Sequence, residues 1–352
     1  DVCILVKQII KNSIYLSNLK VFGEKSMCKK FNILITSIGK RIQLIEHLKQ
    51  KFKIIGADSD SLIAGKYFAD VFYKIPKADE SDYLKSIYQI CIREKVKAVI
   101  PLYEGEFELL NTARNKLEAI GTKLLLSHGE VISLCRDKKK TYEFFKDLSL
   151  IQIPKVYFQS EIEEIIQCKE ESVMPLFIKP AKGMGSINTF KINNVKELAF
   201  FKEYVKNNII EEFIDGEEFT VDCLVNFSGN PIYIIPRKRI EVRAGEVVKT
   251  CTVHDDFIIN NTRKAIDYLN KASGKINEGT IGPLTIQFIK TRSNKLYLIE
   301  INPRFGGGVP LSFECGADYA DVIEKLLKGQ QVEYENSFQE KTMLRYDNSI
   351  FI

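Results

Sequence analysis

The first third of the chain alternates short apolar runs with amphipathic stretches. Four apolar runs predict buried strands, at residues 32–41, 52–58, 97–101 and 123–127. Three stretches between them carry apolar residues at helical spacing, at residues 42–51, about 81–95 and about 106–119. Strands and helices that alternate in this way form a parallel sheet with crossover helices. We therefore predict an N-terminal α/β domain with a parallel sheet in residues 27–130.

After a helix predicted at about 138–147, strands dominate the pattern. The predicted strands lie at residues 175–179, 188–192, 208–225 (two strands around a turn), 232–249, 282–289 and 296–302, with a closing strand in 341–352. Two further helices are predicted at about 257–273 and 318–328. Tight turns between several of these strands, such as Asp215-Gly216 and Arg292-Ser-Asn294, predict hairpins.

Composition excludes several classes of protein. A length of 352 residues predicts two or three domains. The net charge of +5, with lysine spread along the chain, argues against a nucleic-acid partner. The eight cysteines form no CxxC pair and there are only three histidines, which indicates a reduced, cytoplasmic protein without a histidine-based metal site. No apolar run reaches membrane-spanning length. Residues 1–26, before Met27, are interpreted as an extension of unclear role outside the functional fold.

Glu300, Asn302 and Arg304 are each two residues apart at the end of a predicted strand. That spacing sends the three side chains to one face, while Ile299 and Ile301 are predicted to point into the core. Burying charge is costly without compensation, and Mg²⁺ with phosphate oxygens would compensate it. The alternative is a strand end whose charges face solvent. Three glycines at 306–308 follow, and glycine lets backbone N–H groups approach an anion.

Lys179 ends an apolar strand and precedes a glycine-rich loop that does not match a Walker loop. Its ammonium either binds an anion or reaches solvent past an apolar surface. Gln287 is predicted to face Glu300 across a hairpin. Arg237, Arg239, Glu241 and Arg243 share one face of a regular strand, which is either functional or simply solvated.

Two further features are ambiguous when taken alone. The hairpin at 208–225 offers a strand edge to an adenine ring and Glu217 or Glu218 to ribose, but it also fits an ordinary hairpin. In the N-terminal domain, Gly39 and Asp58 form only a weak dinucleotide fingerprint. The carboxyl ends of its strands, where ligands bind in such sheets, offer Ser37, Arg41, Asp58, Glu104 and Glu106.

The order of these motifs resembles that of the ATP-grasp superfamily, most closely its carbamoyl-phosphate-synthase-like carboxylate–amine ligases, over residues 30–352. The motifs that carry the resemblance are Asp137-Lys138, Phe177-Ile-Lys-Pro180, Glu211-Glu-Phe-Ile214 with Gly216-Glu-Glu218, Arg243-Ala-Gly-Glu246 and Ile299-Glu-Ile-Asn-Pro-Arg-Phe-Gly-Gly-Gly308. The resemblance implies an ATP-grasp domain in residues 131–352, made of a lid at about 141–214 and a C-terminal antiparallel-sheet domain.

The resemblance also implies site residues and cofactors. ATP would contact Lys138, Lys179, Ser186, Glu211, Glu212, Phe213, Ile214 and Glu218. Two Mg²⁺ ions, with Mn²⁺ as an alternative, would bind Gln287, Glu300 and Asn302. Many members carry a carboxylate where this chain has Gln287, and an amide is a weaker Mg²⁺ ligand. Lys179, Arg304, Arg243 and Arg239 would be catalytic, and Glu104, Glu106, Arg243 and Gly307 would contact substrate.

The implied reaction is ADP-forming. A small-molecule carboxylate attacks the γ-phosphate, and an amine then displaces phosphate from the acyl phosphate to give an amide. Amino-acid-like substrates are expected, and a homodimer is an option by analogy. Two alternatives stay open at this point: activation of bicarbonate, as in carbamoyl phosphate synthase, and a nucleotide-binding regulatory module without turnover.

Overall fold

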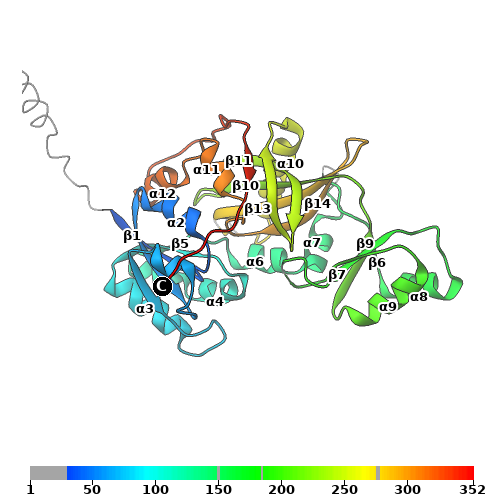
Figure 1. The fold of residues 1–352 in the computed structure, drawn as a ribbon, viewed down its shortest axis with the longest axis horizontal. Helices are drawn as coiled ribbons and strands as arrows, with labels where there is room; N and C mark the ends of the chain where they lie inside the picture. Colours follow the sequence, from blue (N-terminus) through cyan, green and yellow to red (C-terminus); the bar gives the residue numbers. More distant parts are fainter. Residues whose placement is uncertain (1–29, 149–150, 184, 275–277) are drawn as a thin grey trace, which may run out of the picture. The chain divides into compact units, whose positions relative to one another are not determined.

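The computed structural model describes residues 30–148, 151–183, 185–274 and 278–352. The predicted extension at residues 1–26 lies outside the described residues. Residues Asn32–Ile352 form one compact unit, whose chain can be followed in Figure 1. Within the described ranges, no helix has both the length and the apolar character needed to cross a bilayer. The domain boundaries drawn from the sequence stay a prediction.

The N-terminal part contains the predicted parallel sheet, with five strands in the order β3-β2-β1-β4-β5. The strands are β1 Phe31–Thr36, β2 Phe52–Asp58, β3 Val71–Lys74, β4 Val96–Pro101 and β5 Lys123–Leu124. The crossovers carry the 3₁₀ helices η1 Ala64–Tyr67 and η2 Glu104–Glu106 and the α-helices α2 Ile42–Lys49, α3 Tyr83–Arg93, α4 Phe107–Thr112 and α5 Arg114–Ala119. A core that includes Leu34, Val99 and Phe107 packs between sheet and helices. The strand order changes direction between β1 and β4, where ligands bind in folds of this type.

Two of the predicted elements in this part are shorter than expected. The helix expected at about 106–119 is broken at Ala113 into α4 and α5. The strand expected at 123–127 ends at Leu124, because the Arg114 guanidinium donates to the carbonyls of Leu124, Leu126 and Ser127. A side chain therefore satisfies backbone acceptors that a longer strand would satisfy by pairing.

A four-stranded sheet follows, in the order β6-β9-β7-β8, with antiparallel pairs. After α6 Gly129–Arg136 and α7 Lys138–Phe145 come β6 Val156–Tyr157, α8 Gln159–Cys168, β7 Leu176–Pro180, β8 Phe190–Ile192, α9 Val195–Tyr204 and β9 Asn208–Glu212. Figure 1 shows α8 and α9 beside this sheet, and their apolar residues share its core. The pattern did not predict α6, α8 and α9. The strand expected at 188–192 begins at Phe190, because Ser186 and Asn188 have left-handed backbone angles.

The third sheet has six strands in the order β14-β13-β10-β11-β12-β15, all antiparallel. They are β10 Glu217–Val225, β11 Pro231–Arg243, β12 Glu246–Thr252, β13 Gly282–Lys290, β14 Leu296–Asn302 and β15 Thr342–Leu344. The accompanying helices are α10 Asp256–Leu269, α11 Pro310–Glu314 and α12 Tyr319–Leu327. The closing strand expected in 341–352 is thus only three residues long, and most of the later residues are exposed.

A bulge in β14 corrects one prediction about its faces. Gln287 pairs with Glu300 as predicted, but Phe288 pairs with Leu298, so Ile299 is an extra residue in the ladder. Ile301 is buried with 1% exposure, whereas Ile299 is half-buried and lines a cavity together with Glu300. The prediction that Ile299 points into the core was therefore wrong, because strict alternation fails at a bulge.

Candidate active site

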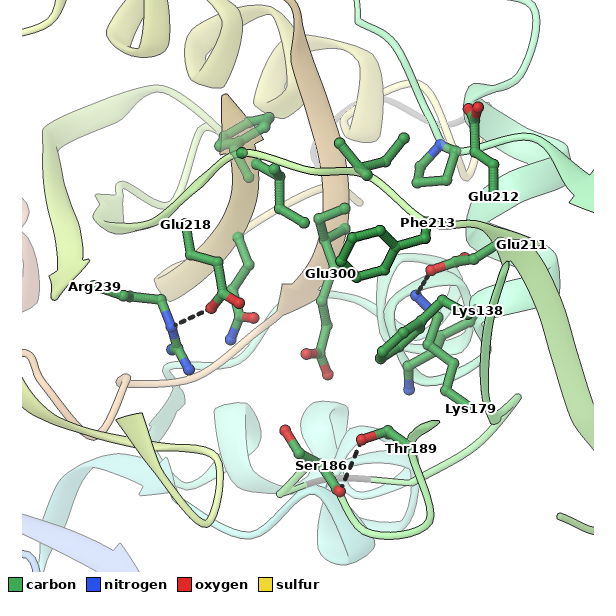
Figure 2. Close-up of a pocket in the computed structure, with 18 of the residues that line it drawn as sticks. Lys138, Lys179, Ser186, Thr189, Glu211, Glu212, Phe213, Glu218, Arg239 and Glu300 are labelled. Atoms are coloured by element: carbon green, nitrogen blue, oxygen red, sulfur yellow. Dashed lines mark hydrogen bonds and ion pairs between the residues drawn. The ribbon is translucent and has the colours of Figure 1, made fainter. Parts of the chain in front are cut away.

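A cavity of about 260 Å³ is lined by residues of both the four-stranded and the six-stranded sheet (Figure 2). Its apolar walls come from Phe177, Phe213, Ile214, Phe288, Ile289 and Ile299. Its charged groups come from Lys138, Lys179, Glu211, Glu212, Asp215, Glu218, Arg239 and Glu300. Among the described residues, nothing accepts a hydrogen bond from the Ile214 N–H. Apolar walls with a free backbone donor suit a flat heterocycle, and the charged end suits an anion.

Two lysines meet at the charged end of this cavity. Lys179 Nζ lies 2.6 Å from Glu211 Oε1, and both side chains are less than a tenth exposed. The alternative in which Lys179 reaches solvent is therefore wrong. Lys138, the first residue of α7, donates from Nζ to Gly183 O at 3.2 Å, so it reaches the glycine-rich loop. Burial lowers the pKa of Lys138 and Lys179 lowers it further, while Glu300 opposes the shift. A polyanion here would stabilise both ammonium groups.

Gln287, Glu300 and Asn302 lie at the other end of this charged region. Gln287 and Glu300 are direct cross-strand neighbours, and Asn302 is only 4% exposed. In the described ranges, none of the three side chains has a hydrogen bond or ion pair within the protein. Figure 2 shows the Glu300 carboxylate between the Glu218–Arg239 pair and the two lysines. The solvent-facing alternative for this strand end is therefore wrong.

These three side chains fit a Mg²⁺ ion that shares its ligands with a phosphate. They supply one carboxylate and two amide oxygens, and hard oxygen ligands are those that Mg²⁺ prefers. In the part of the chain that the structure describes, no group of three or more His, Cys, Asp or Glu side chains is arranged to hold a metal by itself. A bound phosphate would therefore have to complete the coordination of Mg²⁺.

A second cavity of about 140 Å³ shares Gly185, Ser186, Arg239, Gln287 and Glu300 with the first. It continues toward the glycine loop after β14, which packs tightly against charged side chains. A Cβ on Gly308 would lie 2.5 Å from Arg237 Nη1. A Cβ on Gly307 would lie 3.2 Å from Glu246 Oε2. Close packing explains the glycines here, where the sequence suggested only backbone contact with an anion.

Arg237 and Arg239 hold this region together. Arg237 forms a two-bond ion pair with Asp222 at 2.6 and 3.0 Å, and both side chains are almost fully buried. Arg239 donates to Glu218 at 2.9 Å and to Gly245 O at 3.2 Å. Burial lowers the pKa of Arg239, and Glu218 opposes that shift. The strand face predicted for these arginines is thus not simply a solvated ladder.

Two family models match the chain. A PylC-like N-terminal domain matches residues 33–125, and an ATP-grasp domain matches residues 135–308. The chain belongs to the ATP-grasp superfamily. Its matched ATP-grasp segment contains both lysines of the first cavity and the Gln287–Glu300–Asn302 set.

Curated relatives of this ATP-grasp chain are large chains of carbamoyl phosphate synthase. That of Campylobacter jejuni is 25% identical over 301 residues, which are 80% of this chain and 26% of the relative. The arginine-specific large chain of Geobacillus stearothermophilus is 24% identical over 255 residues, which are 71% of this chain and 24% of the relative. The chain therefore spans about a quarter of the length of these relatives.

Solved structures share the fold of this ATP-grasp chain. The biotin carboxylase domain of Hydrogenobacter thermophilus 2-oxoglutarate carboxylase, in complex with MgADP, ADP and bicarbonate, has a TM-score of 0.69 at 19% identity. The match covers 90% of this chain and 75% of the biotin carboxylase chain. Staphylococcus aureus N5-carboxyaminoimidazole synthetase complexed with ADP has a TM-score of 0.68 at 20% identity. That match covers 90% of this chain and 82% of the synthetase. An L-amino acid ligase from Bacillus licheniformis has a TM-score of 0.62 at 18% identity, and the match covers 85% of this chain and 75% of the ligase.

Most of the site residues predicted for the ATP-grasp chain line the two cavities, but three do not. Arg243 is exposed at the end of β11 and lines neither cavity. Glu104 is buried, and its carboxylate forms an ion pair with Arg304 at 2.9 Å instead of facing either cavity. Glu106 is fully buried, accepts hydrogen bonds from Thr36 and Ser37 and lines neither cavity. Burial raises the pKa of Glu106.

Two residues that line the second cavity, Arg41 and Glu246, had no predicted role of their own. Arg41 was expected only as one of several polar residues at strand ends, and Glu246 only as part of a motif. Arg41 donates to Gly306 O at 3.2 Å, and Glu246 accepts from Arg345 at 2.7 Å. These partners are 265 and 99 residues apart along the chain, so no local spacing could have indicated them.

Proposed function

We propose that this protein is an ADP-forming ligase that activates a small-molecule carboxylate as an acyl phosphate and joins it to an amine. The observation that carries the proposal is the position of Gln287, Glu300 and Asn302. These side chains have no partners among the described residues. Gln287 and Glu300 line both cavities, and Asn302 lines the second. A nucleotide triphosphate in the first cavity would present its γ-phosphate to an acid in the second.

The first cavity would hold ATP. Its apolar walls suit adenine, with the Ile214 N–H as a free donor and the Glu212 backbone and Phe213 beside it. Glu218 would bind the ribose, and Lys138 and Lys179 the phosphates, with Ser186 in the loop above them. Gln287, Glu300 and Asn302 would hold Mg²⁺, for which we propose two ions, with Mn²⁺ as an alternative. The metal neutralises phosphate charge when bound.

The chemistry then needs positioning and charge neutralisation from the protein, not a covalent intermediate on it. A carboxylate oxygen of the acid attacks the γ-phosphorus, and the bond to the β-phosphate oxygen breaks to release ADP. The amine nitrogen next attacks the acyl carbon and loses a proton, the bond from that carbon to the phosphate oxygen breaks, and the phosphate leaves as inorganic phosphate with that proton. Arg304 and Arg239, beside the shared part of the cavities, would stabilise the charge that develops. Arg243 lies outside both cavities, so we assign this role to Arg304 and Arg239 alone.

A screen for ADP release tests the proposal. The protein is assayed with MgATP against pooled amino acids, dipeptides and bicarbonate, each with and without an added amine. Release that depends on an amino-acid-like carboxylate supports the proposal. Arg304→Ala is expected to lose turnover by about 10²-fold or more while it still binds ADP. Unaltered turnover in that variant would remove Arg304 from the mechanism.

Bicarbonate activation is the second candidate function, because the curated relatives are carbamoyl phosphate synthase large chains. The same screen separates the two, since release with bicarbonate alone would select this second candidate. If no substrate causes ADP release although the protein binds ATP, the protein is a nucleotide-binding regulatory module.

A homodimer is proposed by analogy with the biotin carboxylase domain dimer. Light scattering on the purified protein tests that proposal.

A further inference from the structure

Four arginines line the second cavity: Arg41, Arg237, Arg239 and Arg304. Three of them each form an ion pair with one carboxylate, at N–O distances of 2.6–2.9 Å: Arg237 with Asp222, Arg239 with Glu218 and Arg304 with Glu104. Arg41 has no such pair within the described residues. Its Nη1 donates only to a backbone carbonyl, that of Gly306, at 3.2 Å.

Within the described residues, the guanidinium of Arg41 therefore has no carboxylate in direct contact. Burial and the nearby Arg304 lower the pKa of Arg41 to about 10, so it stays protonated at neutral pH. Glu246 and Asp222 act in the opposite direction, but Glu246 already accepts from Arg345 Nη1 at 2.7 Å and Asp222 from Arg237 Nε at 2.6 Å. A half-buried guanidinium near Arg304 and Arg345, without an ion pair of its own, is costly unless an anion joins it.

The position of Arg41 puts it within reach of a molecule that is activated in this cavity. It follows β1, in the loop that leads from the parallel sheet into α2. A Cβ on Gly307 would lie 3.5 Å from Arg41 Nη1, so the guanidinium faces the glycine loop that lines the cavity. Asn302 and Arg304 line the same small cavity. A short acid could thus place one carboxylate beside Asn302 and Arg304 and a second group beside Arg41.

We propose that the acid substrate carries a second carboxylate, which Arg41 binds and which is not activated. One unpaired guanidinium matches one carboxylate in charge and in its two-bond geometry. Arg41 would thus be a specificity residue supplied by the N-terminal part of the chain. The inference rests on the proposed ligase function and narrows its substrate to diacids and acidic amino acids.

Hydroxylamine provides a test that isolates the acid. It is an uncharged nucleophile that attacks an acyl phosphate to give a hydroxamate and inorganic phosphate, so no anion on the amine substrate can interfere. Hydroxamate formation is measured with matched pairs: succinate and succinamate, L-glutamate and L-glutamine, L-aspartate and L-asparagine. In at least one pair, the diacid is expected to have a KM about tenfold or more below that of its half-amide. Equal KM values in every active pair would overturn the proposal.

Three variants assign the effect to Arg41. Arg41→Gln should raise the KM of the active diacid about tenfold or more, with kcat within about twofold and the KM of ATP unchanged. Arg41→Lys should retain part of the preference, because it keeps the charge but loses the planar fork. Lys40→Gln removes the same charge from an exposed neighbour in the loop and should leave kcat and the KM values of the diacid and of ATP unchanged. A rise in the KM of ATP, or equal rises for diacid and half-amide, would contradict a carboxylate site at Arg41.

A binding measurement separates this inference from the proposed function. Succinate and succinamate are titrated calorimetrically into the MgADP-loaded protein and into its Arg41→Gln variant. Tighter binding of succinate that is lost in Arg41→Gln supports the inference even if no hydroxamate forms with any acid, an outcome that would overturn the ligase function alone. Equal binding of the two compounds by the unmodified protein would overturn the inference, whatever the turnover.

Discussion

Two buried ion pairs in this molecule have the same length and different surroundings. Lys179–Glu211 and Arg237–Asp222 both join a nitrogen and an oxygen at 2.6 Å. The Arg237–Asp222 pair is saturated, because Ser312 donates to Asp222 at 2.7 Å and Arg237 makes a second bond to the same carboxylate at 3.0 Å. In the described ranges, Lys179 Nζ has Glu211 as its only partner and borders a cavity.

The difference separates structure from function. All three nitrogens of Arg237 are bonded within the protein, to Asp222 and Thr250, whereas the Lys179 ammonium makes a single bond to the described residues and retains two of its three protons for a ligand. We therefore assign the Lys179–Glu211 pair to the proposed binding site, whereas the Arg237–Asp222 pair packs against the glycine loop beside it. Burial and distance alone would not distinguish them, but the number of bonds that each cation already makes within the described residues does, three for Arg237 and one for Lys179.

The largest expected effect is on stability, in Arg237→Met. Removing the guanidinium leaves Asp222 buried without a cation and should lower the free energy of unfolding by about 3–5 kcal/mol. Urea denaturation of the ligand-free protein measures it. The double variant Arg237→Met/Asp222→Leu should recover more than half of the loss. As a control, Arg345→Met breaks a partly exposed pair with Glu246 and should cost less than about 1 kcal/mol. Equal losses in the two single variants would contradict the comparison.

The corresponding change in the other pair should act on turnover. Lys179→Gln removes a cation from the proposed phosphate site and should lower kcat by about 10²–10³-fold. The double variant Lys179→Gln/Glu211→Gln removes both charges and should regain stability but not turnover. Steady-state ADP release and urea denaturation of the same samples check both expectations. Recovery of turnover in the double variant would show that Lys179 serves Glu211 and not a ligand.

The sequence allowed the pieces of this site to be predicted, but not their assembly. Alternation and turn chemistry predicted the parallel sheet and the pairing of Gln287 with Glu300, because both depend on residues close in sequence. They missed α8, whose short apolar face, Ile162 and Ile165, gives little periodic signal. They also misplaced Ile299, since a bulge adds one residue without any mark in the pattern.

The same reasoning explains why the charge partners were missed. Arg304 pairs with Glu104 across 200 residues, and Arg41 donates to Gly306 across 265. No local rule relates residues so far apart, so the sequence alone led to the prediction that Glu104 contacts substrate. Which charges are already neutralised is a property of the folded chain, and that property decides which remain for ligands.

A smaller effect is expected at the proposed metal site. Gln287→Glu places a second carboxylate opposite Glu300, and like charges in such a pair are destabilising by roughly 0.2–1 kcal/mol. With Mg²⁺ and ADP present, the added ligand should instead raise the melting temperature and lower the Mg²⁺ concentration that supports ADP release. Thermal unfolding with and without MgADP checks the change of sign. The variant Glu217→Gln, at an exposed position, serves as a control. Destabilisation that MgADP does not reverse would place the metal elsewhere.

The smallest effect concerns Glu106, a buried carboxylate whose partners in the described part of the chain are all uncharged. Burial raises its pKa above the usual 4.5, while hydrogen bonds from Tyr83 and Thr36 oppose the shift. The folded protein therefore binds more protons than the unfolded chain from pH 4.5 up to the raised pKa, and stability falls as pH rises through that window. The glutamine in Glu106→Gln does not titrate. Urea denaturation from pH 5 to 8 should therefore show the free energy of unfolding of the variant rising relative to that of the unmodified protein as pH rises. A constant difference would mean that the neutral donors hold the Glu106 carboxylate charged throughout this pH range.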